Sequence, residues 1–220
     1  MVSPYVTDND AALRFLHVLS GIVWIGMLYF FNLVNLPLLK FQMRKPYDAN
    51  MAEKATAHIT IKTLFWFRWG AASTVLFGLI LLYGHMEGYR AGLEAGGVLA
   101  YHVYAIYLGA LLALVMAFNV WFVIWPRQQK ILGNNKAIAA TADEAEKKRL
   151  GEANAPLVKT AVMASRVNTW LSIPMLWGMV FGAHGDAFTT ARQWALPVVL
   201  LVVLLLVAAM YSQAKKPKAA

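Results

Sequence analysis

Four of the five histidines in this sequence lie within, or at the end of, long apolar segments. His17 is in RFLHVLSGIVWIG and His102 is in AYHVYAIYLG, whereas His85 and His184 close such segments in LLYGH and VFGAH. A neutral imidazole nitrogen ligates haem iron, copper or zinc, and ionisable residues inside membrane spans mark functional sites by default. We therefore predict His17 and His102 as axial ligands, with His85 and His184 as a second pair or as part of an entry for electrons or substrate.

The neighbouring residues narrow the choice of cofactor. The chain contains no Cys, which excludes thiolate metal sites, iron–sulfur clusters and thioether-linked c-type haem in this chain. It also contains no HExxH motif, which disfavours a zinc hydrolase. Gly21 and Gly109 share a helical face with His17 and His102, where a flat ring could approach the backbone, although such glycines also let membrane helices pack closely. These features favour one or two b-type haems, with copper as the alternative.

The elements that carry the histidines are predicted to be membrane helices. The chain is 60% hydrophobic and only 14% charged, compared with about 25% charged residues in soluble domains. A spanning helix needs about 20 apolar residues. Five segments meet this length: 11–39, 64–83, 99–125, 161–183 and 194–211. We predict an all-α, polytopic membrane bundle forming a single domain over 1–212, with a surface helix within 127–160 and a basic tail at 213–220.

Lys and Arg residues are concentrated in the first and third connections and in the C-terminal tail. By the positive-inside rule these parts are cytoplasmic and the N-terminus is outside, in a bacterial inner membrane. The net charge of +9 is then a signal of topology, and we expect the lipid bilayer rather than nucleic acid as the partner. We identify no cleavable signal peptide. This orientation brings all four histidines to the outer side.

A weak internal repeat relates the first four segments. His17, Asn32 and Pro37 in the first segment correspond to His102, Asn119 and Pro126 in the third. The second and fourth segments each begin near an arginine and end at a histidine: Arg68 with His85, and Arg166 with His184. These matches predict a parallel two-helix repeat, with a pseudo-two-fold axis along the membrane normal.

A second polar group is predicted at the opposite, basic side of the membrane. Its members are Asn32, Asn35, Arg68, Asn119, Arg166 and Asn168. They could bind the propionates of a cofactor, a quinone or a substrate. Alternatively, the arginines extend to lipid phosphate and the asparagines link helices.

Two stretches resemble a known family. LHVLSGIVWIGMLYFFNLVNLP in the first segment and SRVNTWLSIPMLWGMVFGAH in the fourth are similar to the membrane domain of PuuD-type bacterial urate hydroxylases, called urate oxidase N-terminal. The second and third segments resemble it loosely, and copper-resistance D and HemJ-type membrane proteins are more distantly similar. The residues that carry over by motif are His17, Gly21, Trp24, Gly26, Arg166, Asn168 and His184.

The resemblance implies a helical protein on an electron-transfer route, with histidines for b-type haem. In the family a cytochrome c domain receives the electrons. Because this chain lacks CxxCH, we expect a separate cytochrome c or respiratory-chain partner. We predict a haem-binding electron-transfer protein. The alternatives are a membrane oxidase or hydroxylase acting on urate or a porphyrinogen, a copper transporter, and a structural subunit of a respiratory complex. A homo-oligomer is compatible with each.

Overall fold

The computed structural model describes residues 8–37 and 49–184, and these residues are almost entirely helical, as predicted. The elements are α1 (Asp8–Tyr29), η1 (Phe30–Asn35), α3 (Ala49–Gly84), α4 (Met86–Ala95), α5 (Gly97–Phe118), η2 (Asn119–Ile124), α6 (Trp125–Ala140) and α7 (Glu144–His184). The predicted fifth span at 194–211 and the basic tail at 213–220 lie outside the described residues.

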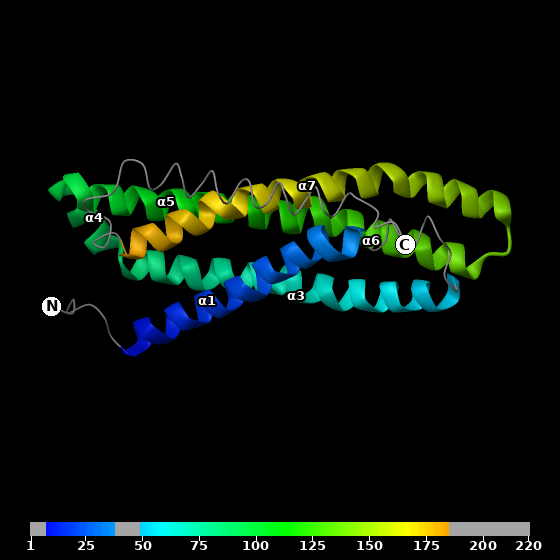
Figure 1. The fold of residues 1–220 in the computed structure, drawn as a ribbon, viewed down its shortest axis with the longest axis horizontal. Helices are drawn as coiled ribbons and strands as arrows, with labels where there is room; N and C mark the ends of the chain where they lie inside the picture. Colours follow the sequence, from blue (N-terminus) through cyan, green and yellow to red (C-terminus); the bar gives the residue numbers. More distant parts are fainter. Residues whose placement is uncertain (1–7, 38–48, 185–220) are drawn as a thin grey trace, which may run out of the picture.

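The long helices form two antiparallel pairs (Figure 1). In the first pair α1 packs along α3, and in the second pair α5 and η2 pack along α7. We call the end where α1 begins, α3 ends, α5 begins and α7 ends the histidine end, because His17, His85, His102 and His184 lie on its helices. The other end, with the start of α3, α6 and the start of α7, is the basic end.

Within residues 8–37 and 49–184, three helices are long and apolar enough to cross a membrane: Asn9–Asn35, Ile59–Gly84 and Leu99–Ala140. They indicate an integral membrane protein. The predicted fourth span, 161–183, is helical and lies along α5 as part of α7. It is not among these candidate spans of the described chain, because polar residues such as Asn168, Thr169 and Ser172 lower its hydropathy.

The predicted surface helix within 127–160 takes a different form. α6 and the first half of α7 make an antiparallel hairpin that continues directly from the second pair. Asn154 fastens this hairpin: its side-chain oxygen accepts from Asn134 at 2.8 Å and its nitrogen donates to Asn135 at 2.9 Å. The polar stretch is therefore helical and continues two helices of the bundle.

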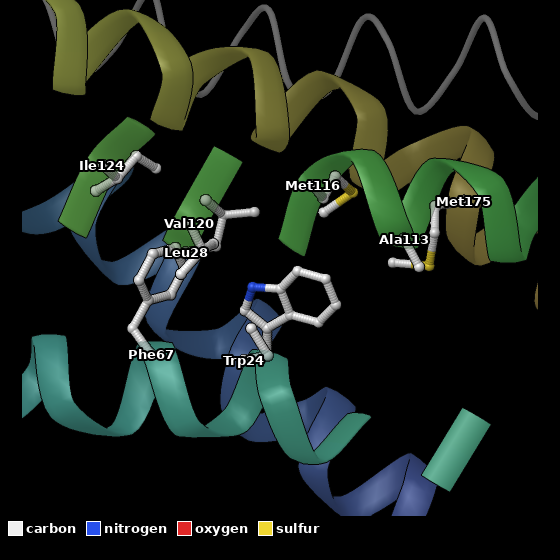
Figure 2. Close-up of a cluster of buried hydrophobic side chains, with 9 residues drawn as sticks. Trp24, Leu28, Phe67, Ala113, Met116, Val120, Ile124 and Met175 are labelled. Carbon is white, nitrogen blue, oxygen red and sulfur yellow. The ribbon is translucent and has the colours of Figure 1, made fainter. Parts of the chain in front are cut away.

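The apolar core lies where the two pairs meet (Figure 2). Trp24 and Leu28 of α1 pack there with Phe67 of α3, Met116 of α5 and Val120 of η2. Trp24 and Leu28 have no exposed surface. At this level α1 therefore packs against its own partner α3 and also against α5 and η2 of the second pair.

Glycines set the close approach within each pair. In the first pair, a Cβ atom added at Gly70 would lie 3.1 Å from the backbone nitrogen of Trp24. In the second, a Cβ at Gly178 would lie 2.5 Å from the carbonyl oxygen of Ala105. Since small residues allow backbones of membrane helices to approach, both pairs depend on the missing side chains.

Each pair also contains a π-helical segment in its first helix. In η1 the backbone N–H of Leu36 bonds to the carbonyl of Phe31, and after η2 that of Trp125 bonds to Val120, five residues earlier in both cases. Asn32 lies in η1 and Asn119 in η2. The matching pairs and π segments agree with the predicted two-helix repeat.

Candidate functional site

His17 is fixed against α3 by a side-chain-to-backbone hydrogen bond. Its Nδ1 lies 2.9 Å from the carbonyl oxygen of Thr74. A carbonyl only accepts, so Nδ1 carries the proton and, in the neutral ring, Nε2 keeps its lone pair. Metal-ligating histidines commonly donate their other ring N–H to such a carbonyl, which fixes the ring and the tautomer. His17 therefore has the orientation and the protonation of a ligand that binds through Nε2.

Gly78 provides the room for this imidazole. A Cβ atom built there would lie 2.9 Å from Cε1 and 3.2 Å from Nδ1 of His17. Any other residue at this position would push the ring away from Thr74. The lack of a side chain at Gly78 thus allows an imidazole to lie on the backbone of α3.

Residues three or four apart place one continuous face of α1 against α3. Asp10, Arg14, His17, Gly21 and Trp24 follow this spacing, which keeps side chains on one side of a helix. Their contacts with α3 follow in order: Asp10 with His85, His17 with Thr74, and Trp24 with Gly70. The local sequence of α1 therefore explains why His17 faces α3.

His102 has a comparable place in the second pair. It is half-buried on α5, on the same helical face as Ala105, Ile106 and Gly109. Those residues contact α7 at Gly178 and Gly182. His102 thus lies on the side of α5 that packs on α7, and within the described part of the chain its ring has no hydrogen-bond partner.

His85 belongs to an ion cluster at the start of α1. Its Nδ1 donates to the carbonyl of Leu81 at 2.9 Å, and its Nε2 lies 2.9 Å from Nη2 of Arg14 and 3.3 Å from Oδ1 of Asp10. Arg14 also donates to Asp10 at 2.6 Å, and Asp10 is only 6% exposed. Both ring nitrogens are therefore engaged by the protein. The predicted role of His85 as a metal ligand would require one of these contacts to break, and it stays a prediction.

Tyr89 extends this cluster towards the second pair. Its ring lies 6.0 Å from that of His85 and 5.9 Å from that of Tyr107 on α5, measured between ring centroids. α4 lies outside the three membrane spans. Burial raises the pKa of the Tyr89 phenol above its ordinary value, while Arg14 opposes this shift. The cluster thus joins the two pairs at the histidine end.

The predicted second polar group forms a buried seam between α1, η2 and α7. Asn32 donates to Ser165 at 2.7 Å. Asn168 accepts from Asn119 at 2.9 Å and donates to the carbonyl of Met116 at 2.9 Å. Tyr29 and Ser172 are also bonded at 2.9 Å. These bonds link helices, which matches the alternative role considered for the asparagines.

Some polar atoms near this seam lack partners. They are Nε1 of Trp24, Oδ1 of Asn32, and Nε of Arg166, each buried without a hydrogen bond in the described structure. Arg68 lies apart from the seam, against the Trp125 ring. The structure therefore brings Asn32, Asn119 and Asn168 together and separates Arg68 from them.

The remaining predicted residues are placed as follows. Gly21 makes an ordinary contact with Thr74, 3.9 Å from a built Cβ to Cγ2. A Cβ at Gly109 would lie 3.1 Å from the backbone of α7 at Met175 and Met179. Gly109 thus serves the helix contact, and its predicted place beside a haem ring stays a prediction. His184 is the last residue of α7, and its side chain lies outside the described part.

One family model matches the chain. It is described as urate oxidase N-terminal and covers residues 94–220, more than half of the sequence. The chain belongs to the urate oxidase N-terminal family. The search of curated proteins gave no match, and neither did the search of solved structures.

The extent of the family match differs from the predicted one. The stretch from Ser165 to His184 lies inside the matched range, as does the third apolar segment, which was expected to resemble the family only loosely. The first apolar segment, with His17, lies outside it. The family assignment therefore rests on the second helix pair and the residues after it.

Sequence reasoning missed Asp10, Arg14 and Tyr89. The first two lie at the polar start of α1 and reach His85 on another helix. The signal that could have found them is the three-and-four spacing that continues from His17 back to Asp10.

Proposed function

We propose that this protein holds b-type haem and passes electrons within the membrane, with His17 and His102, one from each helix pair, as axial ligands. The observation that carries the proposal is the His17 imidazole, whose Nδ1 is bonded to the Thr74 carbonyl and whose Nε2 is left for iron. Haem would supply one-electron chemistry, since its iron changes oxidation state without any change in the protein's own residues.

The donor set of the described residues fits haem better than a compact metal site. No group of three or more His, Asp or Glu side chains gathers among the described residues. Zinc sites need three or four protein ligands, whereas haem iron takes its four equatorial bonds from the porphyrin and needs only axial residues. Copper stays the alternative, and a bound metal without a porphyrin spectrum would favour it.

The protein's own residues would hold the ligand still and keep water away. Thr74 and Gly78 fix the ring of His17, and Arg14 and Asp10 close the bundle next to it at His85. Hydrogen bonding to an axial histidine and burial are the means by which a protein tunes a haem potential. We assign His85 to this supporting role.

The orientation follows from the basic connections. The N-terminus would lie outside and the basic end in the bacterial cytoplasm. A separate c-type acceptor would then approach the histidine end.

The experiment is a visible spectrum of the protein purified in mild detergent after expression with added haem. We expect reduced-minus-oxidised b-type bands and a stoichiometric pyridine haemochrome. H17A should lower the haem content at least about tenfold, because a ligand is lost. H58A is the matched control, since His58 lies on α3 towards the basic end. Folded protein without porphyrin bands, or H17A with unchanged bands, would reject the proposal.

A second candidate, oxidation of urate or a related substrate, is favoured only by the family description. Reduction of the bound haem on addition of urate alone would support it. A haem that urate leaves oxidised, but that a chemical donor reduces, would support electron carriage instead.

A further inference from the structure

Arg68 is a partly buried cation enclosed by tryptophan rings. Its Cζ lies 3.7 Å from the ring centroid of Trp125, 5.4 Å from that of Trp121 and 5.9 Å from that of Trp69. These rings come from α6, η2 and α3. Cation–π contact stabilises the guanidinium face, but it leaves the in-plane N–H groups to find acceptors.

Those acceptors are missing among the described residues. Nε and Nη1 of Arg68 are buried and have no hydrogen-bond partner, and Arg68 forms no ion pair there. A charge taken out of water without a counter-charge is costly, so such arginines normally pair with an anion. The guanidinium presents a planar fork of donors that matches the oxygens of a phosphate or a carboxylate.

A cavity of about 130 Å³ lies beside Arg68. Its lining is Ile61, Leu64, Phe65, Arg68, Trp125 and Leu132. Apart from Arg68 and the indole N–H of Trp125, this wall is apolar. A free inorganic anion gains nothing from such a wall, whereas a molecule with an anionic head and an apolar body matches both parts of the cavity.

The position along the bundle indicates where that molecule comes from. The aromatic run FWFRW (65–69) and Trp121 and Trp125 lie at one level of the basic half. Trp-rich belts lie at the headgroup level of a membrane, where lipid phosphates are found. Lys62 on α3 and Arg127 and Lys130 on α6 are close in sequence to the residues that line the cavity and add positive charge to these two helices.

We propose that the cavity beside Arg68 binds an anionic phospholipid, with the phosphate accepting hydrogen bonds from the guanidinium of Arg68 and an acyl chain lying on Ile61, Leu64, Phe65 and Leu132. Trp125 holds the guanidinium in place. The site is independent of the proposed haem, because none of its residues contacts the His17 region.

The test is binding of phosphatidylglycerol to the full-length protein in mild detergent, followed by native mass spectrometry and thermal unfolding. Phosphatidylcholine and inorganic phosphate are the comparison ligands. The variants are R68Q, R68K and, as a charge-matched control at the histidine end, R90Q. We expect selective binding of phosphatidylglycerol that raises the melting temperature of the wild type and of R90Q.

R68Q should bind phosphatidylglycerol about tenfold more weakly, because a charge-assisted pair is lost. R68K keeps the charge but lacks the planar set of donors, so its affinity for phosphatidylglycerol should lie between those of R68Q and the wild type. If R68Q does not fold, the affinity of R68K provides the test. Equal binding by R68Q and the wild type would overturn the proposal. So would equal binding of phosphatidylcholine, stabilisation by inorganic phosphate alone, or displacement of the lipid by a neutral quinone.

Discussion

The two helix pairs share one architecture but use their glycines differently. In the first pair, the space at Gly78 is occupied by the imidazole of His17. In the second pair, the space at Gly109 and Gly178 is occupied by the backbone of the opposite helix. Gly78 therefore admits a side chain between two helices, whereas Gly109 and Gly178 bring two backbones together, as Gly70 does at another level of the first pair.

This difference indicates a division of labour within a repeated fold. The second pair is also tied by Asn168 to α5 and η2. The first pair keeps a polar ring between its helices, close to an ion cluster of Asp10, Arg14 and His85. We infer that backbone contact holds the helices of the second pair together near its proposed ligand His102, whereas the first pair makes room between its helices for its own, His17.

Replacing Gly178 by alanine should have the largest effect on stability. The new Cβ would lie 2.5 Å from Ala105 O and 2.9 Å from Gly109 N. Both are backbone atoms, so α5 and α7 must separate, at about 1–3 kcal/mol. Thermal unfolding in detergent measures this loss. G151A is the control, because Gly151 is also on α7 and nothing lies within 4 Å of a Cβ atom built there. Equal melting temperatures for G178A and G151A would show that the second pair does not depend on the close backbone contact at Gly178.

Replacing Gly78 by alanine should change ligand binding more than stability. The methyl group displaces the His17 ring, whereas the gain in helix propensity of up to about 1 kcal/mol offsets the lost hydrogen bond. We expect haem content about tenfold lower, since the support of the axial ligand is lost. G84A on the same helix has no neighbour within 4 Å and should behave as wild type. If G78A keeps full haem content and an unchanged spectrum, Gly78 does not serve the imidazole.

The smallest effect is expected at the junction of the two pairs, where Tyr89 lies. Burial raises its pKa above the ordinary value of 10.0. The unfolded chain then loses this proton at lower pH than the folded protein does, so stability falls as pH rises above about 10. In Y89F the stability should decrease less steeply as the pH rises. Y83F is the control, because Tyr83 is 78% exposed. Unfolding at alkaline pH, followed by phenolate absorbance, checks this expectation. Identical profiles of stability against pH for Y89F and Y83F would contradict it.

Hydropathy and helical spacing predicted much of the fold, because both act over short distances. The apolar segments, their pairing and the correspondence of Asn32 with Asn119 follow from local pattern. Local pattern does not reveal which residue of another helix a given side chain contacts. Gly78 matters because His17, far away in sequence, faces it, and the role of His85 depends on Asp10 at the start of another helix.

The family resemblance was also predicted, and one of the two stretches that carried it, Ser165 to His184, lies in the matched range. The first apolar segment carries a histidine and glycines that look distinctive in isolation, yet the matched range begins at residue 94. The polar residues of α7 were informative for a physical reason. Asn168 and Ser172 have to be satisfied inside an apolar bundle, so their positions are tied to the neighbouring helices.

The π segments have a consequence for how such a protein can change over generations. A π turn bonds each N–H to the carbonyl five residues back, so it accommodates one more residue than an α turn. Loss of a single codon within η1 would be absorbed by a return to the α register, because the six residues of η1 turn the chain about as far as five α-helical residues do. His17 would keep its place against α3, whereas loss of one residue from the α-helical part between His17 and η1 would rotate His17 by about 100°. The π segment is therefore a place where the chain can lose one residue without redirecting the proposed ligand.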